Sequence, residues 1–81
     1  MLRKTLVNTQ PAVGELIKEI RTLTCLTQEQ LASVLGVTYS TVNRWENGRG
    51  KPSLMGLKRI EEILQTMGSQ GMDLLQKYLT K

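Results

Sequence analysis

Basic and amide side chains gather in one stretch of the sequence, between Thr27 and Arg59. Five lysines and arginines stand there against two acidic residues, Glu29 and Glu46. Guanidinium, ammonium and amide groups donate hydrogen bonds to phosphates and to base edges. The net charge of +4 over 81 residues permits a polyanionic partner without requiring one. The chemistry to consider is therefore binding to a polyanion, and the positions of these groups must decide it.

Catalytic and metal-binding chemistry is disfavoured by what the sequence lacks. It has no histidine, the commonest general base and a common metal ligand, and its single cysteine, Cys25, can form no internal disulfide. Carboxylates such as those of Glu15 and Glu19 lie at a spacing typical of a solvated helix face. We therefore expect no enzymatic activity, no catalytic residue, no cofactor and no metal site.

The size and composition fit one small soluble domain. With 40% hydrophobic and 22% charged residues, 81 residues can build a single hydrophobic core. No apolar run approaches the roughly 18 residues of a membrane span, and the start MLRKTLVN is not apolar enough for a signal peptide. We expect a cytoplasmic protein with no membrane contact and no evident small-molecule ligand.

The spacing of apolar residues predicts five helices and therefore an all-α fold. Val13, Leu16, Ile17 and Ile20 follow the i, i+3, i+4, i+7 pattern of an amphipathic helix. Capping residues and glycines place the ends of the segments. The expected helices cover about 11–23, 28–35, 39–47 and 53–67, with a fifth after Gly68. Residues 1–10 form a flexible or extended arm, 11–67 the main domain and 68–81 the C-terminal helix.

The second and third expected helices have the spacing of a helix-turn-helix motif. Thr27 and Thr38 each stand where an N-cap is needed. Counting from Gln28, the inner positions hold Ala32 (fifth), Gly36 (ninth), Val42 (fifteenth) and Trp45 (eighteenth). The small residue lets the helices approach, the glycine makes the turn, and the two apolar residues anchor the second helix on the core. An ordinary helical hairpin within a five-helix bundle is the alternative.

The run LTQEQLASVLGVTYSTVNRWENGRGKPS resembles the DNA-binding core of the XRE or Cro/repressor-type helix-turn-helix family, over about residues 13–67. The matching features are Arg21 near the end of the first helix, Thr27 with Gln28, Leu31 with Ala32, and the ending from Trp45 to Gly48. One departure is Cys25, where a Gly or Asn is usual. The resemblance implies a compact, five-helix, lambda-repressor-like domain that binds double-stranded DNA.

Within this resemblance the outer face of the third helix enters the major groove, since Val42 and Trp45 face inward. The implied base-reading residues are Tyr39, Ser40, Thr41, Asn43 and Arg44, of which Arg44 suits guanine and Asn43 suits adenine. The implied phosphate-binding residues are Gln28 at the start of the second helix, and Asn47, Arg49 and Lys51 after the third. The resemblance also implies a structural salt bridge between Arg21 and Glu46.

The function that follows is sequence-specific DNA binding by a small bacterial or phage transcriptional regulator, cytoplasmic and associated with the nucleoid. We expect a homodimer, because two copies can read half-sites about one helical turn apart. The candidate dimer contacts are Met72, Leu75, Tyr78 and Leu79, and packing of this segment on its own core is an equally open alternative.

Two other functions stay open. One is an antitoxin-like or DNA-modification-system accessory that needs a protein partner, and the other is a protein-interaction bundle that binds no DNA. Three roles also stay open for the arm: contact with DNA through Arg3 and Lys4, exchange between protomers, and disorder.

Overall fold

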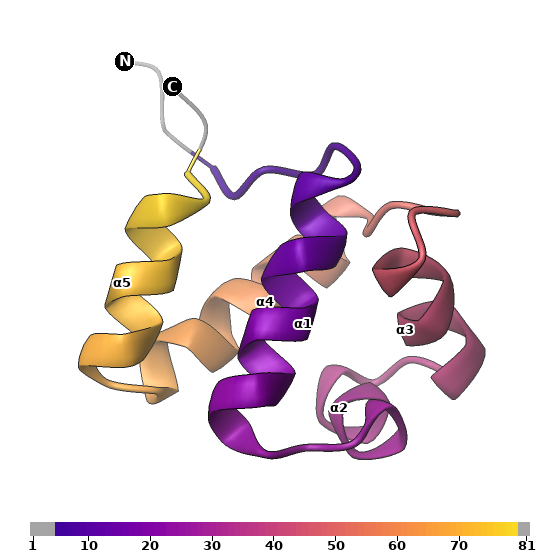
Figure 1. Cartoon of the computed structure of the whole chain (residues 1–81), viewed down its shortest axis with the longest axis horizontal. Coiled ribbons are helices and arrows are strands. Elements are labelled where there is room, and N and C mark those ends of the chain that lie inside the picture. The colour runs from indigo at the N-terminus through magenta and orange to yellow at the C-terminus, as the bar shows by residue number, and fades with distance from the viewer. Residues whose placement is uncertain (1–4, 80–81) are drawn as a thin grey trace.

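The computed structural model describes residues 5–79, in which five helices surround one core (Figure 1). The helices are α1 (Ala12–Thr24), α2 (Gln28–Leu35), α3 (Tyr39–Glu46), α4 (Leu54–Thr66) and α5 (Ser69–Lys77). The expected all-α, five-helix architecture is confirmed, and the first four helices begin and end within one residue of the expected bounds. None of the described helices is long and apolar enough to cross a membrane.

Side-chain caps explain where α2, α3 and α4 begin. Thr27 Oγ1 accepts a hydrogen bond from Gln30 N at 3.1 Å, and Gln30 Oε1 accepts one from Thr27 N at 2.9 Å, which completes a capping box at α2. Thr38 and Ser53 accept the corresponding bonds at the starts of α3 and α4, both at 3.2 Å. Each cap accepts a hydrogen bond from a first-turn amide, and at α3 the same amide, Thr41 N, also donates to Thr38 O at 3.1 Å.

Cys25 closes α1 in the left-handed conformation, with φ 59° and ψ 27°. A residue with a Cβ pays about 1–2 kcal/mol in this region, where the resemblance leads one to expect Gly or Asn. The turn from α1 to α2 is therefore strained at this position, and the thiol is exposed.

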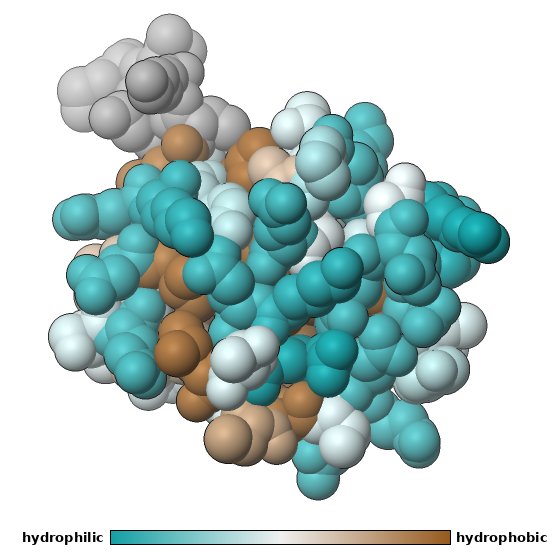
Figure 2. All heavy atoms as spheres, in the orientation of Figure 1, coloured by the Kyte–Doolittle hydropathy of each residue, from teal (hydrophilic) through white to brown (hydrophobic). Residues whose placement is uncertain are grey.

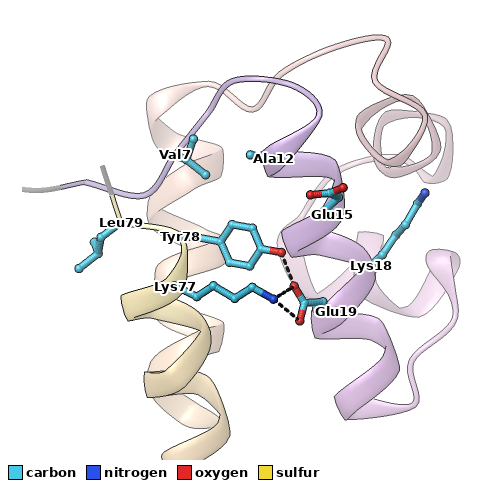
Figure 3. A pocket seen from close by; sticks show the side chains of 8 residues that line it. All are labelled: Val7, Ala12, Glu15, Lys18, Glu19, Lys77, Tyr78 and Leu79. Carbon is cyan, nitrogen blue, oxygen red and sulfur yellow. Dashed lines mark hydrogen bonds and ion pairs between the residues drawn. The ribbon is translucent and has the colours of Figure 1, made fainter. Parts of the chain in front are cut away.

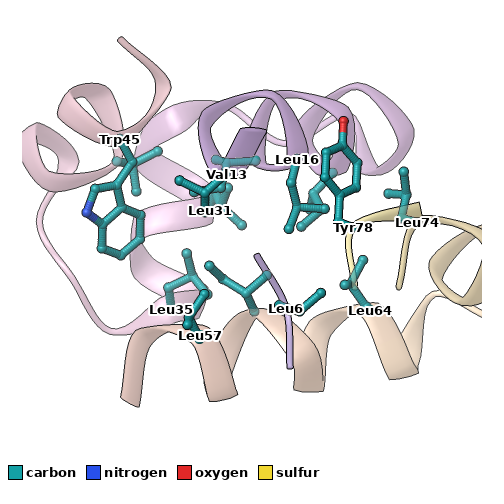
Figure 4. Packing of buried hydrophobic residues seen from close by; sticks show 14 of the residues in the cluster. Leu6, Val13, Leu16, Leu31, Leu35, Trp45, Leu57, Leu64, Leu74 and Tyr78 are labelled. Carbon is teal, nitrogen blue, oxygen red and sulfur yellow. The ribbon is translucent and has the colours of Figure 1, made fainter. Parts of the chain in front are cut away.

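The core joins side chains from all five helices and from the N-terminal arm (Figure 4). The completely buried side chains of this core include those of Val13, Leu16 and Ile17 from α1. Val42 of α3 and Leu64 of α4 are completely buried as well. Of the fifteen buried hydrophobic residues in the described part of the chain, four come from α1, more than from any other helix.

The described part of the arm is extended and belongs to the packed domain. Leu6 is only 3% exposed and forms an antiparallel bridge with Leu79. Val7 N donates to Tyr78 O at 2.8 Å. Leu6 and Val7 are therefore held in place by burial and backbone pairing. Arg3 and Lys4, for which a DNA contact was considered, lie outside the described residues.

A close approach between α4 and α5 turns the last helix back onto the core. A Cβ at Gly71 would lie 1.8 Å from Leu64 O, so only glycine lets the two backbones come this near. Leu74 of α5 reaches the core as a result and is 5% exposed.

Tyr78, one of the four candidate dimer contacts, lies against the core of its own chain. Its ring is 8% exposed and packs in the protein's own core, and its hydroxyl donates a hydrogen bond to Glu19 Oε2 (Figure 3). Lys77 Nζ lies 3.1 Å from the same carboxylate oxygen. The hydrogen bond from Tyr78, with that from Lys77 and the lysine charge, holds the pKa of Glu19 below its usual value, although burial acts against this. Tyr78 thus packs within its own chain, which is the alternative that was left open for this segment.

Candidate nucleic-acid interface

Helices α2 and α3 are joined at Gly36, which ends α2 in the left-handed conformation with φ 73°. Val37 N then donates to Ala32 O at 2.9 Å and closes the turn. The two anchor residues of α3, Val42 and Trp45, are 0% and 6% exposed. This packing leaves the opposite face of α3 on the surface of the molecule.

The outer face of α3 carries the residues that were expected to read bases. Tyr39, Ser40 and Arg44 are exposed, and Thr41 and Asn43 are half-buried. Thr38 Oγ1, the N-cap, lies 3.2 Å from Ser40 Oγ and 2.7 Å from Thr41 Oγ1, so both hydroxyls are held at the first turn. The face therefore offers hydroxyl, amide, guanidinium and aromatic groups along one helix, a set that can form hydrogen bonds with base edges and contact a thymine methyl group.

The loop after α3 brings the expected phosphate-binding residues next to this face. Asn47, Arg49 and Lys51 are all exposed. Arg49 N donates to Arg44 O at 2.8 Å, and Arg44 Nη2 donates to Arg49 O at 3.1 Å. Arg44, on the outer face of α3, and Arg49, in the loop, are therefore linked by two reciprocal hydrogen bonds.

The surface in this region is polar. Figure 2 shows mainly hydrophilic side chains on the side of the molecule formed by α3 and the following loop, while hydrophobic ones gather toward α5 and the lower end of α1. The acidic residue of α3, Glu46, is buried and paired with Arg21, so the positive charge of Arg21 offsets its negative charge near this surface. The exposed cations Arg44, Arg49 and Lys51 thus dominate the local charge.

Arg21 of α1 and Glu46 at the end of α3 form a two-pronged salt bridge. Arg21 Nε lies 2.6 Å from Glu46 Oε2, and Arg21 Nη2 lies 2.9 Å from Glu46 Oε1. The carboxylate side chain is 3% exposed, whereas the guanidinium side chain is 28% exposed. The pair expected from the resemblance therefore fixes the end of α3 to α1.

The pKa of Glu46 reflects this setting. Burial alone would raise it, but hydrogen bonds from Arg21 and Gln28, together with the positive charges of Arg21 and Lys18, hold the pKa below its usual value. The carboxylate is thus ionised at neutral pH, with hydrogen bonds from two residues.

A chain of side-chain amides leads from Glu46 to the surface, and the sequence alone did not indicate it. Gln28 Nε2 donates to Glu46 Oε1 at 3.0 Å, and Gln28 Oε1 accepts from Asn43 Nδ2 at 3.2 Å. Asn43 Oδ1 in turn accepts from Asn47 Nδ2 at 3.1 Å. The chain joins positions 15 and 18 residues apart, which only the packing of α2 against α3 brings together.

The amide chain changes the expectation for Gln28 and narrows that for Asn43. Gln28 was expected to offer its side-chain amide to a phosphate, and one of the two N–H groups of that amide is directed to Glu46. The Asn43 amide is bonded at both its oxygen and its nitrogen. Both side chains therefore serve to orient α3, and neither presents a wholly free amide at the surface.

The chain is similar in sequence to known helix-turn-helix proteins. Residues 17–66 match the model of the helix-turn-helix family. The chain is 42% identical over 50 residues to the HTH-type transcriptional activator BcrR of Enterococcus faecalis, a match that covers 62% of this chain and 24% of that protein. It is 32% identical over 66 residues to an uncharacterized HTH-type transcriptional regulator of Archaeoglobus fulgidus, covering 80% of this chain and 29% of that protein. The chain thus spans less than a third of the length of these two relatives.

Proposed function

Because the chain belongs to the XRE-type helix-turn-helix family, we propose that it binds double-stranded DNA sequence-specifically and regulates transcription. In this proposal the protein acts in the cytoplasm, bound to the nucleoid. Both relatives are named as transcriptional regulators and not as enzymes, and we assign this chain the same kind of role. The observation that carries the proposal is the exposed polar face of α3 beside a basic loop, held in place by a buried salt bridge.

In this proposal α3 lies in the major groove and its outer face reads the sequence. Arg44 is exposed and its guanidinium suits the O6 and N7 atoms of guanine. Tyr39 and Ser40 stand at the first turn of the same face, with Thr41 beside them. Asn43 keeps a second N–H and a second lone pair for an adenine, while its bonds to Gln28 and Asn47 fix the orientation of its amide.

Phosphate contacts come from both sides of the motif. Arg49, Lys51 and Asn47 contact the backbone from the loop after α3. At the other side the first turn of α2 directs backbone amides and the positive end of its dipole toward the DNA. Gln28 contributes there through its main chain, since its side-chain amide is engaged by Glu46 and Asn43.

The dependence of binding on salt tests the proposal. A dimer that neutralises about four phosphates, through Arg49 and Lys51 of each copy, should show a log-log slope of affinity against salt of about −3.6. Fluorescence anisotropy with a labelled duplex, from low to physiological salt, gives this slope. A folded protein that binds no duplex at low salt would contradict the proposal and favour a protein-interaction role.

We further propose that two copies associate through α5. Met72 is 46% exposed, and Leu75 and Leu79 keep part of their side chains on the surface after Tyr78 and Leu74 are buried. Replacing Met72 with glutamate should place a charge in this contact and shift the protein toward the monomer. Sedimentation equilibrium of both proteins, with and without DNA, measures the shift. A wild-type protein that stays monomeric in both conditions would rule out the dimer.

A further inference from the structure

We propose that Gln10 is a positioning residue that holds the DNA-contacting loop, residues 47–51, against the start of α1. The inference rests on the proposed function, because that function assigns phosphate binding to this loop. Gln10 lies in the arm, outside the helix-turn-helix motif, and sequence reasoning gave it no role.

Three hydrogen bonds from one side-chain amide carry the inference. Gln10 Nε2 donates to Trp45 O at 2.8 Å and to Gly50 O at 2.6 Å. Gln10 Oε1 accepts from Gly14 N at 3.1 Å. Both N–H groups of the amide and its oxygen are therefore occupied, and the two donor contacts reach residues 35 and 40 positions away.

Each partner is a main-chain group, and the three partners lie in three different segments. Gly14 N belongs to the first turn of α1, where a helix leaves amides without a helical partner, and Trp45 O belongs to the last turn of α3, where it also accepts from Gly48 N at 3.2 Å. Gly50 O lies in the loop itself, next to the cations Arg49 and Lys51. One side chain thus forms hydrogen bonds with the start of α1, the end of α3 and the loop.

Gln10 is itself fixed from the other side of the arm. Leu6 is buried in the core and paired with Leu79, and Val7 is hydrogen-bonded to Tyr78. Only two residues separate Val7 from Gln10. The arm therefore reaches the loop from an anchored position, and this gives residues 5–10 a defined part in DNA binding.

A second side chain, Arg44, bonds the neighbouring carbonyl of the loop, Arg49 O, at 3.1 Å. If Arg44 extends into the major groove to read a base, this bond is lost. The bond from Gln10 to Gly50 O does not depend on Arg44, so it keeps the loop in place while Arg44 is engaged. Gln10 thus allows base reading and phosphate binding at the same time.

The test compares Gln10→Ala with Asn8→Ala, a matched change at an exposed position of the same arm. Affinity for a fixed duplex is measured at several salt concentrations, and the melting temperature is recorded for each protein. Gln10→Ala should weaken binding about tenfold and flatten the salt slope, since the loop cations lose their fixed position. Asn8→Ala should bind as the wild type does. Gln10→Ala with unchanged affinity and slope would overturn the inference.

A second pair of measurements separates positioning from general stability. In an Arg49→Ala, Lys51→Ala background, Gln10→Ala should have little further effect on affinity, because the groups that it positions are gone. The same tenfold loss in that background would overturn the inference. Gln10→Glu keeps the size and the acceptor for Gly14 N but removes both donors, so it should lose affinity as Gln10→Ala does, and wild-type affinity would count against the role.

Binding by the wild-type protein separates a failure of the proposed function from a failure of the role of Gln10. Wild-type binding together with normal binding by Gln10→Ala would overturn only the role of Gln10. A wild-type protein that binds no duplex would overturn the proposed function and the positioning role with it.

Discussion

Replacing Arg21 with alanine should lower the free energy of unfolding by about 3–5 kcal/mol, because it leaves a buried carboxylate without its charged partner. The Glu46 side chain is only 3% exposed, so water cannot easily replace the guanidinium. Urea denaturation followed by circular dichroism measures the change. Arg59→Ala is the control: it removes a guanidinium from an exposed position of α4 and should change stability by less than about 0.5 kcal/mol.

The same variant should alter how stability depends on pH. Hydrogen bonds and nearby positive charges hold the pKa of Glu46 below the usual 4.5, against the effect of burial. The stabilisation is therefore fully present above the pKa of the unfolded chain and is lost as the pH falls through the lower pKa of the folded state. Without Arg21, burial should raise that pKa, so the two proteins should approach each other in stability under acid conditions. An Arg21→Ala protein with wild-type melting temperature would show that the pair is not structural.

Arg44→Ala and Arg49→Ala should affect DNA binding in different ways. Loss of Arg44 should relax discrimination at one base pair of each half-site by about 1–3 kcal/mol. Loss of Arg49 should weaken binding to all sequences alike and reduce the salt slope by about 1 per copy. Because Arg44 also bonds the Arg49 carbonyl, its removal should add a smaller loss common to all sequences.

Affinities for a panel of duplexes, each changed at one base pair, give the comparison between these two variants. A flat pattern for Arg49→Ala and a position-specific one for Arg44→Ala would support the assigned roles. If both variants gave the same pattern, the separation between base reading at α3 and phosphate binding in the loop would be wrong.

The helices could be predicted from the sequence because their signals are local. The spacing of Val13, Leu16 and Ile17 defines the buried face of α1, and Thr27 and Gly36 mark the two ends of α2 within a few residues. The exposed face of α3 followed from the inward positions of its apolar residues in the same way.

The contacts that orient the site could not be predicted in this way. The amide chain from Gln28 through Asn43 exists only because α2 and α3 pack at a particular angle, and Gln10 reaches Gly50 across 40 residues. Tyr78 fits an apolar surface pattern whether it packs on a second copy or on its own core, and residue spacing does not reveal the close approach of α5 to α4 at Gly71. Residue type and spacing thus identified the surface groups but not the bonds that hold them.

The central claim is that α3 and the loop after it read a specific DNA sequence as a symmetric pair. Selection from a pool of random duplexes at physiological salt, with sequencing of the bound fraction, tests it most directly. The account predicts enrichment of an inverted repeat whose half-sites lie about 34 Å apart, one helical turn. A bound fraction with the same sequence composition as the starting pool, recovered with folded protein, would contradict it.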